Sequence, residues 1–522
     1  MHLRVVAIAA LVAGLQYVAG YNASIGAADG QDQQQGRQEA WPTKSWPVST
    51  PEQQGMDSAS LARLIETVGT YKQDSLMIVR HGKIVADAYY APYVAGISHD
   101  LRSVTKSVVG TLTAIQLQKG NLDSVDHPVV DLFSDKEIKN VDDRKKAMTV
   151  QSLLDMTSGM EWVERFYTPD ETLMRMYKSP DRTGFVLDQP MAAAPGAKFN
   201  YNGGNPYLLS ALINKKSGQN AFDFAKKELF EPLGIKSAKW GAVDAQGVTI
   251  GEAGLFLSPH DMARFGYLYL RNGMWEGKQI IPASWVERSK DGKISAVGGF
   301  QYANLWWSLP DKGAYMARGR HSQLILVLPK LDIVAVMTGV LRDNEFYSVS
   351  GLIDDIARAV KSDKPLPADP IAAALLTNAI QLAATERPSA IGGTSELVKT
   401  VSGKTYQFSD NVMRVKNFTL NFLDSDSSWV ITTYTDKPER STERFTGLFG
   451  LDGRYRKSPP ALYGINAAKG RWINERTFAL ERRILGRGEI QTWSLTFDGD
   501  KVTVNFENTD GFKAELHGEM SE

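Results

Sequence analysis

The sequence predicts an α/β (α+β) domain followed by a separate all-β domain, and three observations lead to this prediction. Between about residues 45 and 361, segments with helical spacing of apolar residues alternate with strand-like segments. Prolines at 365, 367 and 370 and the pair Gly392-Gly393 then interrupt the chain. Beyond them, short β-type runs are separated by turn residues. A chain of 522 residues is long enough for two or three domains.

These boundaries divide the chain into four parts. We expect a signal peptide at residues 1–23, a mixed α/β domain at 45–361, a linker with a short helix at 362–392, and an all-β barrel or sandwich at 393–522. In the mixed domain the patterns predict helices at 61–68, 103–118, 207–213 and 351–360. They predict strands at 76–79, 84–86, 324–328 and 333–337.

The predicted all-β domain contains short runs of β-branched and aromatic residues. They occur at 406–408, 429–431, 493–497 and 502–506, and the last two alternate apolar and polar residues. Three tryptophans, Trp429, Trp472 and Trp493, either pack in the core of this domain or line a ligand surface. Core packing is the more common role of such side chains, so we expect them to be buried.

The composition excludes several classes of chemistry. The chain has no cysteine, which excludes a cysteine nucleophile, a thiolate metal site and disulfide bonds. Its 59 basic residues balance 59 acidic ones, so nucleic acid is not expected as a partner. The seven histidines form no close pair, so neither a metal nor another cofactor is expected. Any catalysis is therefore expected to use Ser, Lys, Tyr, Asp or Glu.

The N-terminal segment has the pattern of a secretory signal. A short polar start containing His2 and Arg4 precedes an apolar run from Val5 to Ala13, and small residues follow. The apolar run is too short to span a membrane, and without cysteine the chain lacks a lipoprotein anchor. The alternative is a buried N-terminal helix. We expect an exported protein of the periplasm or extracellular space, without a membrane anchor; the sequence leaves its oligomeric state undetermined.

The motif Ser103-Val104-Thr105-Lys106 opens a predicted helix and is the only Ser-x-x-Lys in the chain. Residues three apart share a helix face, so the Lys106 amine can lie beside the Ser103 hydroxyl. The helix N-terminus adds partial positive charge and free N–H groups near a developing oxyanion. A lysine must lose its usual charge to act as a base, which requires burial near other cations. The alternative is a helix-capping serine followed by an exposed lysine.

Two further segments are candidates for the same site. The glycine-rich loop 195–205 carries Tyr201, which can relay protons if neighbouring ammonium groups stabilise its phenolate; otherwise it is an ordinary loop aromatic. The segment Ala317-Arg318-Gly319-Arg320-His321 leads into a strand, and its glycine permits close approach of the backbone to a ligand. His321 also permits a catalytic-triad interpretation with Ser103, although no aspartate is obviously placed to orient it.

Together these three segments resemble the serine β-lactamase and penicillin-binding-protein superfamily. The resemblance is greatest to its class C-like branch, which includes family VIII esterases and 6-aminohexanoate-dimer hydrolases. It covers about residues 45–360 and extends to the segments 77–85, 149–160, 258–266, 275–282 and 306–307. It implies a β-lactamase-like antiparallel sheet flanked by helices, with a helical insertion and a site between the sheet and the insertion.

The resemblance also implies roles for individual residues. Ser103 matches the acylated nucleophile, Lys106 its partner base, and Tyr201 the tyrosine that helps to activate the serine and later the deacylating water. The backbone N–H groups of Ser103 and Arg320 match the oxyanion hole. Substrate contacts are expected from the loop that contains Arg318, Gly319 and His321, and from Trp162 at the start of the insertion.

Two departures from the superfamily pattern bear on the substrate. The Tyr-x-Asn motif of true β-lactamases is Tyr201-Asn202-Gly203 here, so the amide at its third position is missing. Their Lys-Thr-Gly is Ala317-Arg318-Gly319, which removes the lysine that recognises the β-lactam carboxylate. In both departures the sequence resembles the esterase and amidase members of the superfamily, in which such changes are common. Arg318 or Arg320 could supply the missing charge if its side chain turns into the cleft.

The predicted function is that of an exported serine hydrolase. It would cleave an ester or amide, such as a linear peptide or oligoamide, through an acyl-enzyme on Ser103. One alternative is a β-lactamase or D-Ala-D-Ala peptidase. The other is a penicillin-binding-like scaffold that binds a peptide without catalysis. The expected partner is a small-molecule or short-peptide substrate.

Overall fold

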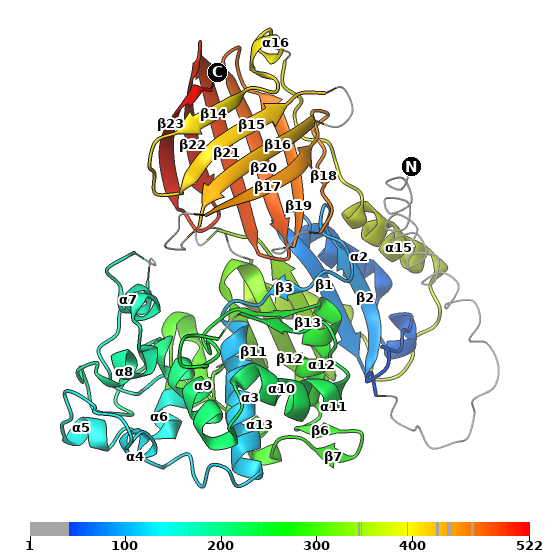
Figure 1. Cartoon of the computed structure of the whole chain (residues 1–522). Coiled ribbons are helices and arrows are strands. Elements are labelled where there is room, and N and C mark those ends of the chain that lie inside the picture. The colour runs from blue at the N-terminus through cyan, green and yellow to red at the C-terminus, as the bar shows by residue number, and fades with distance from the viewer. Residues whose placement is uncertain are drawn as a thin grey trace.

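The computed structural model describes residues 41–521, except 166–167, 242, 343–344, 346, 394, 424–426, 436–440 and 461–463. The expected signal peptide lies outside these residues. Figure 1 shows a domain of mixed helices and sheets with a β domain beside it. The predicted fold class, a mixed domain followed by an all-β domain, is thereby confirmed.

The mixed domain is built on an eight-stranded antiparallel sheet. Its order, β2-β1-β13-β12-β11-β10-β9-β8, places the first hairpin beside the last strand in the chain. The strands are β1 (Gln73–Arg80), β2 (Lys83–Tyr89), β8 (Ile294–Ser295), β9 (Gln301–Ala303), β10 (Trp306–Leu309), β11 (Ala314–Gly319), β12 (Gln323–Leu328) and β13 (Ile333–Gly339). Every residue of β1, β12 and β13 is buried, which explains the mostly apolar sequences of β12 and β13 and the apolar run at 76–79 of β1.

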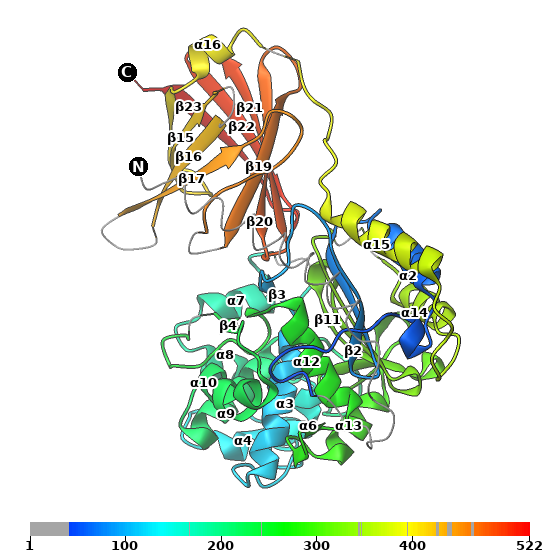
Figure 2. The same ribbon diagram turned by 90° about the vertical axis from the view of Figure 1, so that its right-hand side faces the viewer.

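Helices cover both faces of this sheet because its side chains alternate between them. Leu76 and Ile78 of β1 join one apolar cluster, whereas Met77 and Val79 join the other. Figure 2 shows three helices on the first face, α2 (Ser58–Val68), α14 (Val349–Ala359) and α15 (Pro370–Ala384). The second face is covered by α3 (Val104–Gln118), α12 (Pro259–Leu270) and α13 (Ala283–Lys290).

The helix α15 lies in the segment expected to be a linker. It packs along α2, and Leu376 and Ala379 are buried in the cluster on the first face of the sheet. The Ala91 N–H also donates to the Ala383 carbonyl oxygen at 2.9 Å. The helix is therefore part of the mixed domain's surface layer, and only the residues after it connect the two domains.

A mostly helical insertion packs against α3 on the side away from the sheet. Its helices are α4 (Val129–Leu132), α5 (Asp143–Lys146), α6 (Val150–Leu154), α7 (Thr172–Lys178), α8 (Arg182–Leu187), α9 (Gly204–Ser217), α10 (Ala221–Ala225) and α11 (Glu231–Leu233). Short strands complete this region: β3 (His99–Asp100), β4 (Lys239–Trp240), β5 (Leu255–Leu257), β6 (Met274–Trp275) and β7 (Lys278–Gln279). Because α3 contacts both α9 and β11, its first residues lie where the insertion meets the sheet.

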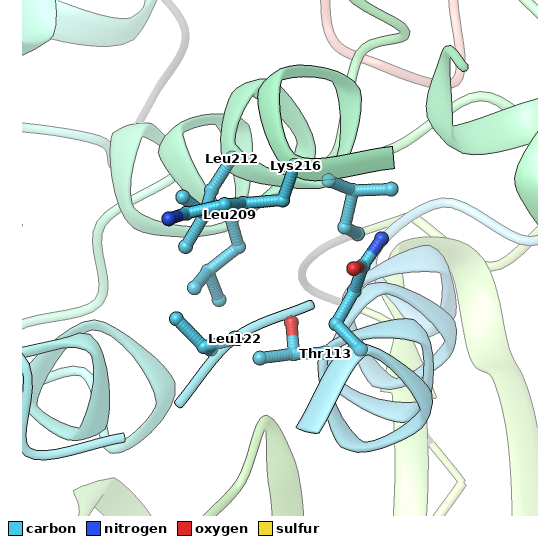
Figure 3. A pocket seen from close by; sticks show the side chains of 7 residues that line it. Thr113, Leu122, Leu209, Leu212 and Lys216 are labelled. Atoms are coloured by element: carbon cyan, nitrogen blue, oxygen red, sulfur yellow. The ribbon is translucent and has the colours of Figure 1, made fainter. Parts of the chain in front are cut away.

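A small hollow lies between α3 and α9. Figure 3 shows Thr113 and Leu122 on one side of it and Leu209, Leu212 and Lys216 on the other. It contains about 180 Å³ of empty space and is too narrow to admit a water molecule. We therefore interpret it as a packing defect between two helices, remote from the N-terminus of α3.

The second domain is a ten-stranded antiparallel sheet curved into a near-barrel (Figure 1). Its order is β17-β16-β15-β14-β23-β22-β21-β20-β19-β18, and α16 (Val398–Val401) precedes it. The strands are β14 (Thr405–Phe408), β15 (Val415–Asn421), β16 (Ser427–Tyr434), β17 (Thr442–Phe449), β18 (Arg456–Lys457), β19 (Ile465–Trp472), β20 (Thr477–Leu485), β21 (Glu489–Asp498), β22 (Lys501–Asn508) and β23 (Lys513–Met520). Trp429, Trp472 and Trp493 are buried in its core, as expected.

Candidate active site

Ser103 lies immediately before α3, at the buried end of that helix. Lys106 follows it in the first turn, and its side chain is only 2% exposed. The Lys106 Nζ donates to Ser103 Oγ at 2.9 Å and to the Glu252 carbonyl oxygen at 2.8 Å. The i, i+3 spacing of the motif therefore produces the expected side-chain pair. The alternative of an exposed lysine does not hold, because Lys106 is buried.

Tyr201 is brought to the same place by the loop before α9. The Lys106 Nζ lies 4.8 Å from the centre of its ring. The ring also stacks on Trp307 of β10, with 6.0 Å between the ring centres and 26° between the planes. The structure thus assembles Ser103, Lys106 and Tyr201, which come from two distant parts of the chain.

The loop that carries Tyr201 is fixed by hydrogen bonds to a residue that the sequence analysis did not single out. Glu164 Oε2 accepts the Gly203 N–H at 2.7 Å and the Trp162 indole N–H at 2.9 Å. A Cβ at position 203 would lie 2.8 Å from the same carboxylate oxygen. Glu164 therefore occupies space beside the position where β-lactamases carry the asparagine of Tyr-x-Asn. In the sequence, only the glycine at position 203 indicated that the asparagine of Tyr-x-Asn is missing; nothing pointed to Glu164 beside it.

The end of β11 lies against the backbone of Ser103. A Cβ at Gly319 would lie 3.1 Å from the Ser103 nitrogen and would collide with the Leu101 carbonyl oxygen. Only glycine permits this approach, since any side chain would push the strand away. In the first turn of α3, the Val104 and Thr105 N–H groups donate to carbonyl oxygens just before the helix. The close approach of Gly319 therefore places Arg320, the next residue, near the start of α3.

The Arg318 guanidinium lies over two aromatic rings. Its guanidinium carbon lies 4.5 Å from the ring centre of Phe300 and 5.7 Å from that of Trp307. Burial lowers the pKa of this guanidinium, and the nearby Tyr201 opposes that shift. Arg318 therefore supplies a positive charge next to the assembled residues.

Arg320 and His321 turn in the opposite direction, toward the β domain. Arg320 Nη1 donates to Asp510 Oδ1 at 2.7 Å. The His321 ring is buried, with Nδ1 facing the Leu341 carbonyl oxygen at 2.7 Å and Nε2 facing Asp510 Oδ1 at 2.9 Å. Both ring nitrogens are thus engaged, so His321 has no nitrogen left to serve Ser103 as a base in a catalytic triad.

Two residues expected at a substrate surface are located in the protein interior. His321 is 3% exposed and is held by the contacts just described. Trp162 is 5% exposed, belongs to the main apolar core and packs against Gly204. The physical reason is the same for both: a large ring finds apolar neighbours and a hydrogen-bond acceptor inside the protein. Trp162 is therefore a core residue that donates a hydrogen bond to Glu164.

Glu252 is a second residue that the sequence analysis did not single out. Its backbone carbonyl binds Lys106, and its carboxyl group is buried. Burial raises the pKa of that carboxyl, and Glu164 raises it further, while Tyr177 and the Lys106 charge oppose the shift. No sequence motif could identify it, because a backbone carbonyl is contributed by every residue type.

The described residues contain neither a cluster suited to a metal ion nor a helix suited to crossing a membrane. Among them there is no group of three or more His, Asp or Glu side chains arranged to hold a metal ion. In the same part of the chain, none of the helices has the length and apolar character needed to cross a lipid bilayer.

The chain is similar to known proteins in sequence. A model of the Beta-lactamase family matches residues 61–346. The chain is 22% identical over 312 residues to a 6-aminohexanoate-dimer hydrolase of Paenarthrobacter ureafaciens, covering 55% of this chain and 78% of the relative.

Two solved structures are similar to this chain at low sequence identity. The octameric penicillin-binding protein homologue of Pyrococcus abyssi is 17% identical, with a TM-score of 0.46, covering 88% of this chain and 99% of that one. A family VIII carboxylesterase is 13% identical, with a TM-score of 0.44, covering 64% and 98%. Because the family model spans more than half of the sequence, the chain belongs to the Beta-lactamase family of serine hydrolases.

Proposed function

We propose that this protein cleaves an ester or amide bond through an acyl-enzyme on Ser103. The observation that carries the proposal is the 2.9 Å contact between Lys106 Nζ and Ser103 Oγ at the buried N-terminus of α3. A serine nucleophile needs an adjacent group to take its proton, and a buried amine within hydrogen-bond distance provides one. A binding scaffold would not require this pair.

The reaction has two steps. Ser103 Oγ attacks the substrate carbonyl carbon, its proton passes to the Lys106 and Tyr201 pair, and the alcohol or amine leaves with that proton. Water then attacks the acyl-enzyme, the carboxylic acid is released, and the proton returns to Ser103. In both steps the backbone N–H groups of Ser103 and Arg320 hold the oxyanion. The contact of Gly319 with the Ser103 backbone supports this placement.

We propose a substrate that carries a carboxylate near the scissile bond. Arg318 supports this proposal, because its guanidinium lies over Trp307, whose ring stacks on Tyr201. A partly buried guanidinium binds a carboxylate more strongly than an exposed one does. A linear peptide or oligoamide has such a group, and the similarity to a 6-aminohexanoate-dimer hydrolase supports the same class.

Arg318 also favours a second candidate, hydrolysis of a β-lactam or of a D-Ala-D-Ala peptide. Both substrates carry a carboxylate, and Arg318 would take over the role of the lysine that Ala317 replaces. The third position of Tyr-x-Asn weighs against it, because Glu164 lies beside Gly203 and would repel an anionic substrate there. Nitrocefin turnover, measured beside ester turnover, distinguishes the two candidates.

We further propose that the protein is exported to the periplasm or extracellular space and acts on a small molecule or short peptide. The N-terminal apolar run at 5–13 and the absence of cysteine support export. Fractionation of cells that produce the full chain tests this proposal. Recovery of the protein only in the cytoplasm, at its uncleaved mass, would contradict it.

The decisive experiment compares wild type with Ser103→Ala. Wild type should hydrolyse a chromogenic short-chain ester and become labelled by a fluorophosphonate probe, whereas Ser103→Ala should do neither. Ser350→Ala, on α14 across the sheet from the site, is the matched control and should behave as wild type. Equal labelling of wild type and Ser103→Ala would refute the proposal in favour of another nucleophile, and no labelling of wild type would favour a non-catalytic scaffold.

A further inference from the structure

The β domain touches the mixed domain directly beside the proposed nucleophile. In the turn between β20 and β21, the Gly486 carbonyl oxygen accepts a hydrogen bond from the Asp100 N–H at 2.5 Å. The neighbouring Arg487 carbonyl oxygen accepts a hydrogen bond from Arg102 Nη2 at 3.1 Å. These contacts lie one and three residues before Ser103, so the β domain contacts the segment that presents the serine.

A second turn of the β domain, between β22 and β23, contributes Asp510. Its carboxylate faces three side chains of the mixed domain: Arg320 at 2.7 Å, His321 at 2.9 Å and Arg102 at 3.9 Å. Arg102 precedes Ser103, and Arg320 is the other residue proposed to donate a backbone N–H to the oxyanion. One carboxylate therefore binds both segments from which the oxyanion hole is built.

Both segments have a backbone conformation that needs support. Arg102, His321 and Ser322 have φ values of +50°, +65° and +77°, in the left-handed region that side chains other than glycine disfavour. Such residues persist only where their surroundings hold them. Asp510 holds the side chains of two of the three, and thereby fixes the direction in which the adjacent N–H groups point.

The ionisation of Asp510 agrees with this role. Burial opposes the charge, but the hydrogen bond from His321 and the charges of Arg102 and Arg320 lower its pKa to about 2. The carboxylate is therefore ionised throughout the neutral range. It can attract both arginines at any pH at which a periplasmic or extracellular hydrolase works.

A second, buried contact holds the two domains in register. Arg483 of β20 donates to Asp74 Oδ1 of β1 at 2.5 Å, and Asp74 Oδ2 binds His99 Nε2 at 3.0 Å. The opposite ring nitrogen of His99 faces the Asp100 carbonyl oxygen at 3.1 Å. Because all these side chains are buried, the β domain cannot rotate on the mixed domain without exposing an unpaired charge.

We propose that Asp510 is a positioning residue that sets the geometry of the oxyanion hole from the β domain. The proposal rests on the function proposed above. In this interpretation the β domain completes the catalytic site, and Asp510 acts through Arg102, Arg320 and His321 without touching the substrate. A purely structural contact between domains would instead affect stability and leave the chemical step unchanged.

The interface offers a matched control for this distinction. Arg342 Nη1 and Glu507 Oε1 form another ion pair between the domains, at 2.9 Å, which joins two residues other than Arg102, Arg320 and His321. Asp510→Asn and Glu507→Gln each remove one carboxylate charge at the same interface. They should therefore differ in catalysis only if position 510 has a special role.

The experiment uses the full-length chain and a chromogenic ester. Asp510→Asn should lower kcat and the rate of fluorophosphonate labelling about 100-fold, the size of effect seen when an oxyanion donor is lost, while KM stays within about threefold. Asp510→Glu, which keeps the charge, should recover part of the lost rate. Glu507→Gln should keep the wild-type kcat, whatever its effect on Tm.

Three results would overturn the proposal: a wild-type kcat in Asp510→Asn, equal losses in both variants, or a loss confined to KM. If Asp510→Asn does not fold, Arg102→Gln decides in its place, because Arg102 is partly exposed. Its kcat should fall at least tenfold, and an unchanged kcat would overturn the proposal. Failure of the proposed function is recognised separately, since wild type would then neither turn over the ester nor become labelled at Ser103.

Discussion

The backbone carbonyl of Glu252 accepts a hydrogen bond from Lys106 Nζ at 2.8 Å, and the same residue carries a carboxyl group that is buried in the protein. The carbonyl orients the lysine toward Ser103. Burial raises the pKa of this carboxyl group above its usual value, and the nearby Glu164 adds to that shift, so the group ionises less readily than in water. A residue that positions the proposed proton acceptor therefore also makes stability depend on pH.

The first prediction concerns Glu252→Gln. In the unfolded chain the Glu252 carboxyl group loses its proton near its usual pKa of 4.5, whereas in the folded protein its pKa is higher. Ionisation of Glu252 therefore favours the unfolded state as the pH rises. The isosteric variant Glu252→Gln has no proton to lose at this position. Its free energy of unfolding should therefore gain on that of wild type by up to about 1.4 kcal/mol for each pH unit above the usual pKa, until the pH reaches the pKa of Glu252 in the folded protein.

Urea unfolding at pH 4, 5, 6 and 7 measures this difference directly. The exposed Glu66 on α2 provides the control, since Glu66→Gln should show the pH dependence of wild type. A stability difference between Glu252→Gln and wild type that is the same at every pH would contradict the prediction.

The second prediction concerns Gly319→Ala. The new methyl group would collide with the Leu101 carbonyl oxygen and lie 3.1 Å from the Ser103 nitrogen, so β11 must move away from α3. The Arg320 N–H would move with it, and kcat should fall by about 10²- to 10³-fold. Ester turnover checks this, with Gly351→Ala on α14 as the control, because a Cβ there makes only ordinary contacts. Retention of more than a tenth of the wild-type kcat in Gly319→Ala would contradict it.

The parts of the site that depend on local spacing could be predicted from the sequence. Ser103 and Lys106 meet because a helix places residues three apart on one face, which any helical segment does. Likewise the hairpin at 76–86 and the helices at 61–68 and 351–360 follow from the periodicity of their own apolar residues. Tyr201 could be placed only through the family resemblance, since a loop tyrosine has no spacing rule.

The remaining parts depend on contacts between distant segments. Asp510 lies more than 180 residues after Arg320 and belongs to a different domain, so no pattern in the sequence connects the two. The sequence left open which of Arg318 and Arg320 turns toward the cleft. The structure resolves this because Phe300 and Trp307 offer Arg318 aromatic faces, whereas Asp510 offers Arg320 a carboxylate. His321 was expected to line the pocket, and the same carboxylate binds it away from Ser103.

The third prediction concerns Tyr201→Phe. The variant keeps the ring that stacks on Trp307 and lies 4.8 Å from Lys106 Nζ, and it loses only the hydroxyl. Because a positioned acid or base contributes about 10²- to 10⁴-fold, kcat should fall within that range while Tm stays unchanged. Tyr71→Phe, at an exposed position, should leave kcat unaltered. A kcat within twofold of wild type in Tyr201→Phe would show that Lys106 moves the proton without the phenol.

The last prediction concerns Arg318→Gln and two chromogenic esters with the same leaving group. One has an acyl chain that ends in a carboxylate, and the other ends in a methyl group of similar size. A hydrogen bond to a charged group contributes about 1.5–3 kcal/mol, so kcat/KM for the carboxylate ester should fall about 10- to 100-fold in the variant. The neutral ester should lose less than threefold, because Arg318 contacts aromatic rings rather than the reacting atoms. Arg63→Gln on α2, whose side chain is exposed, should leave both esters unaffected. Equal losses for the two esters would mean that Arg318 maintains the Trp307 and Tyr201 stack instead of binding a carboxylate. The neutral ester thus separates a role in recognition from a role in packing, which the carboxylate ester alone would not do.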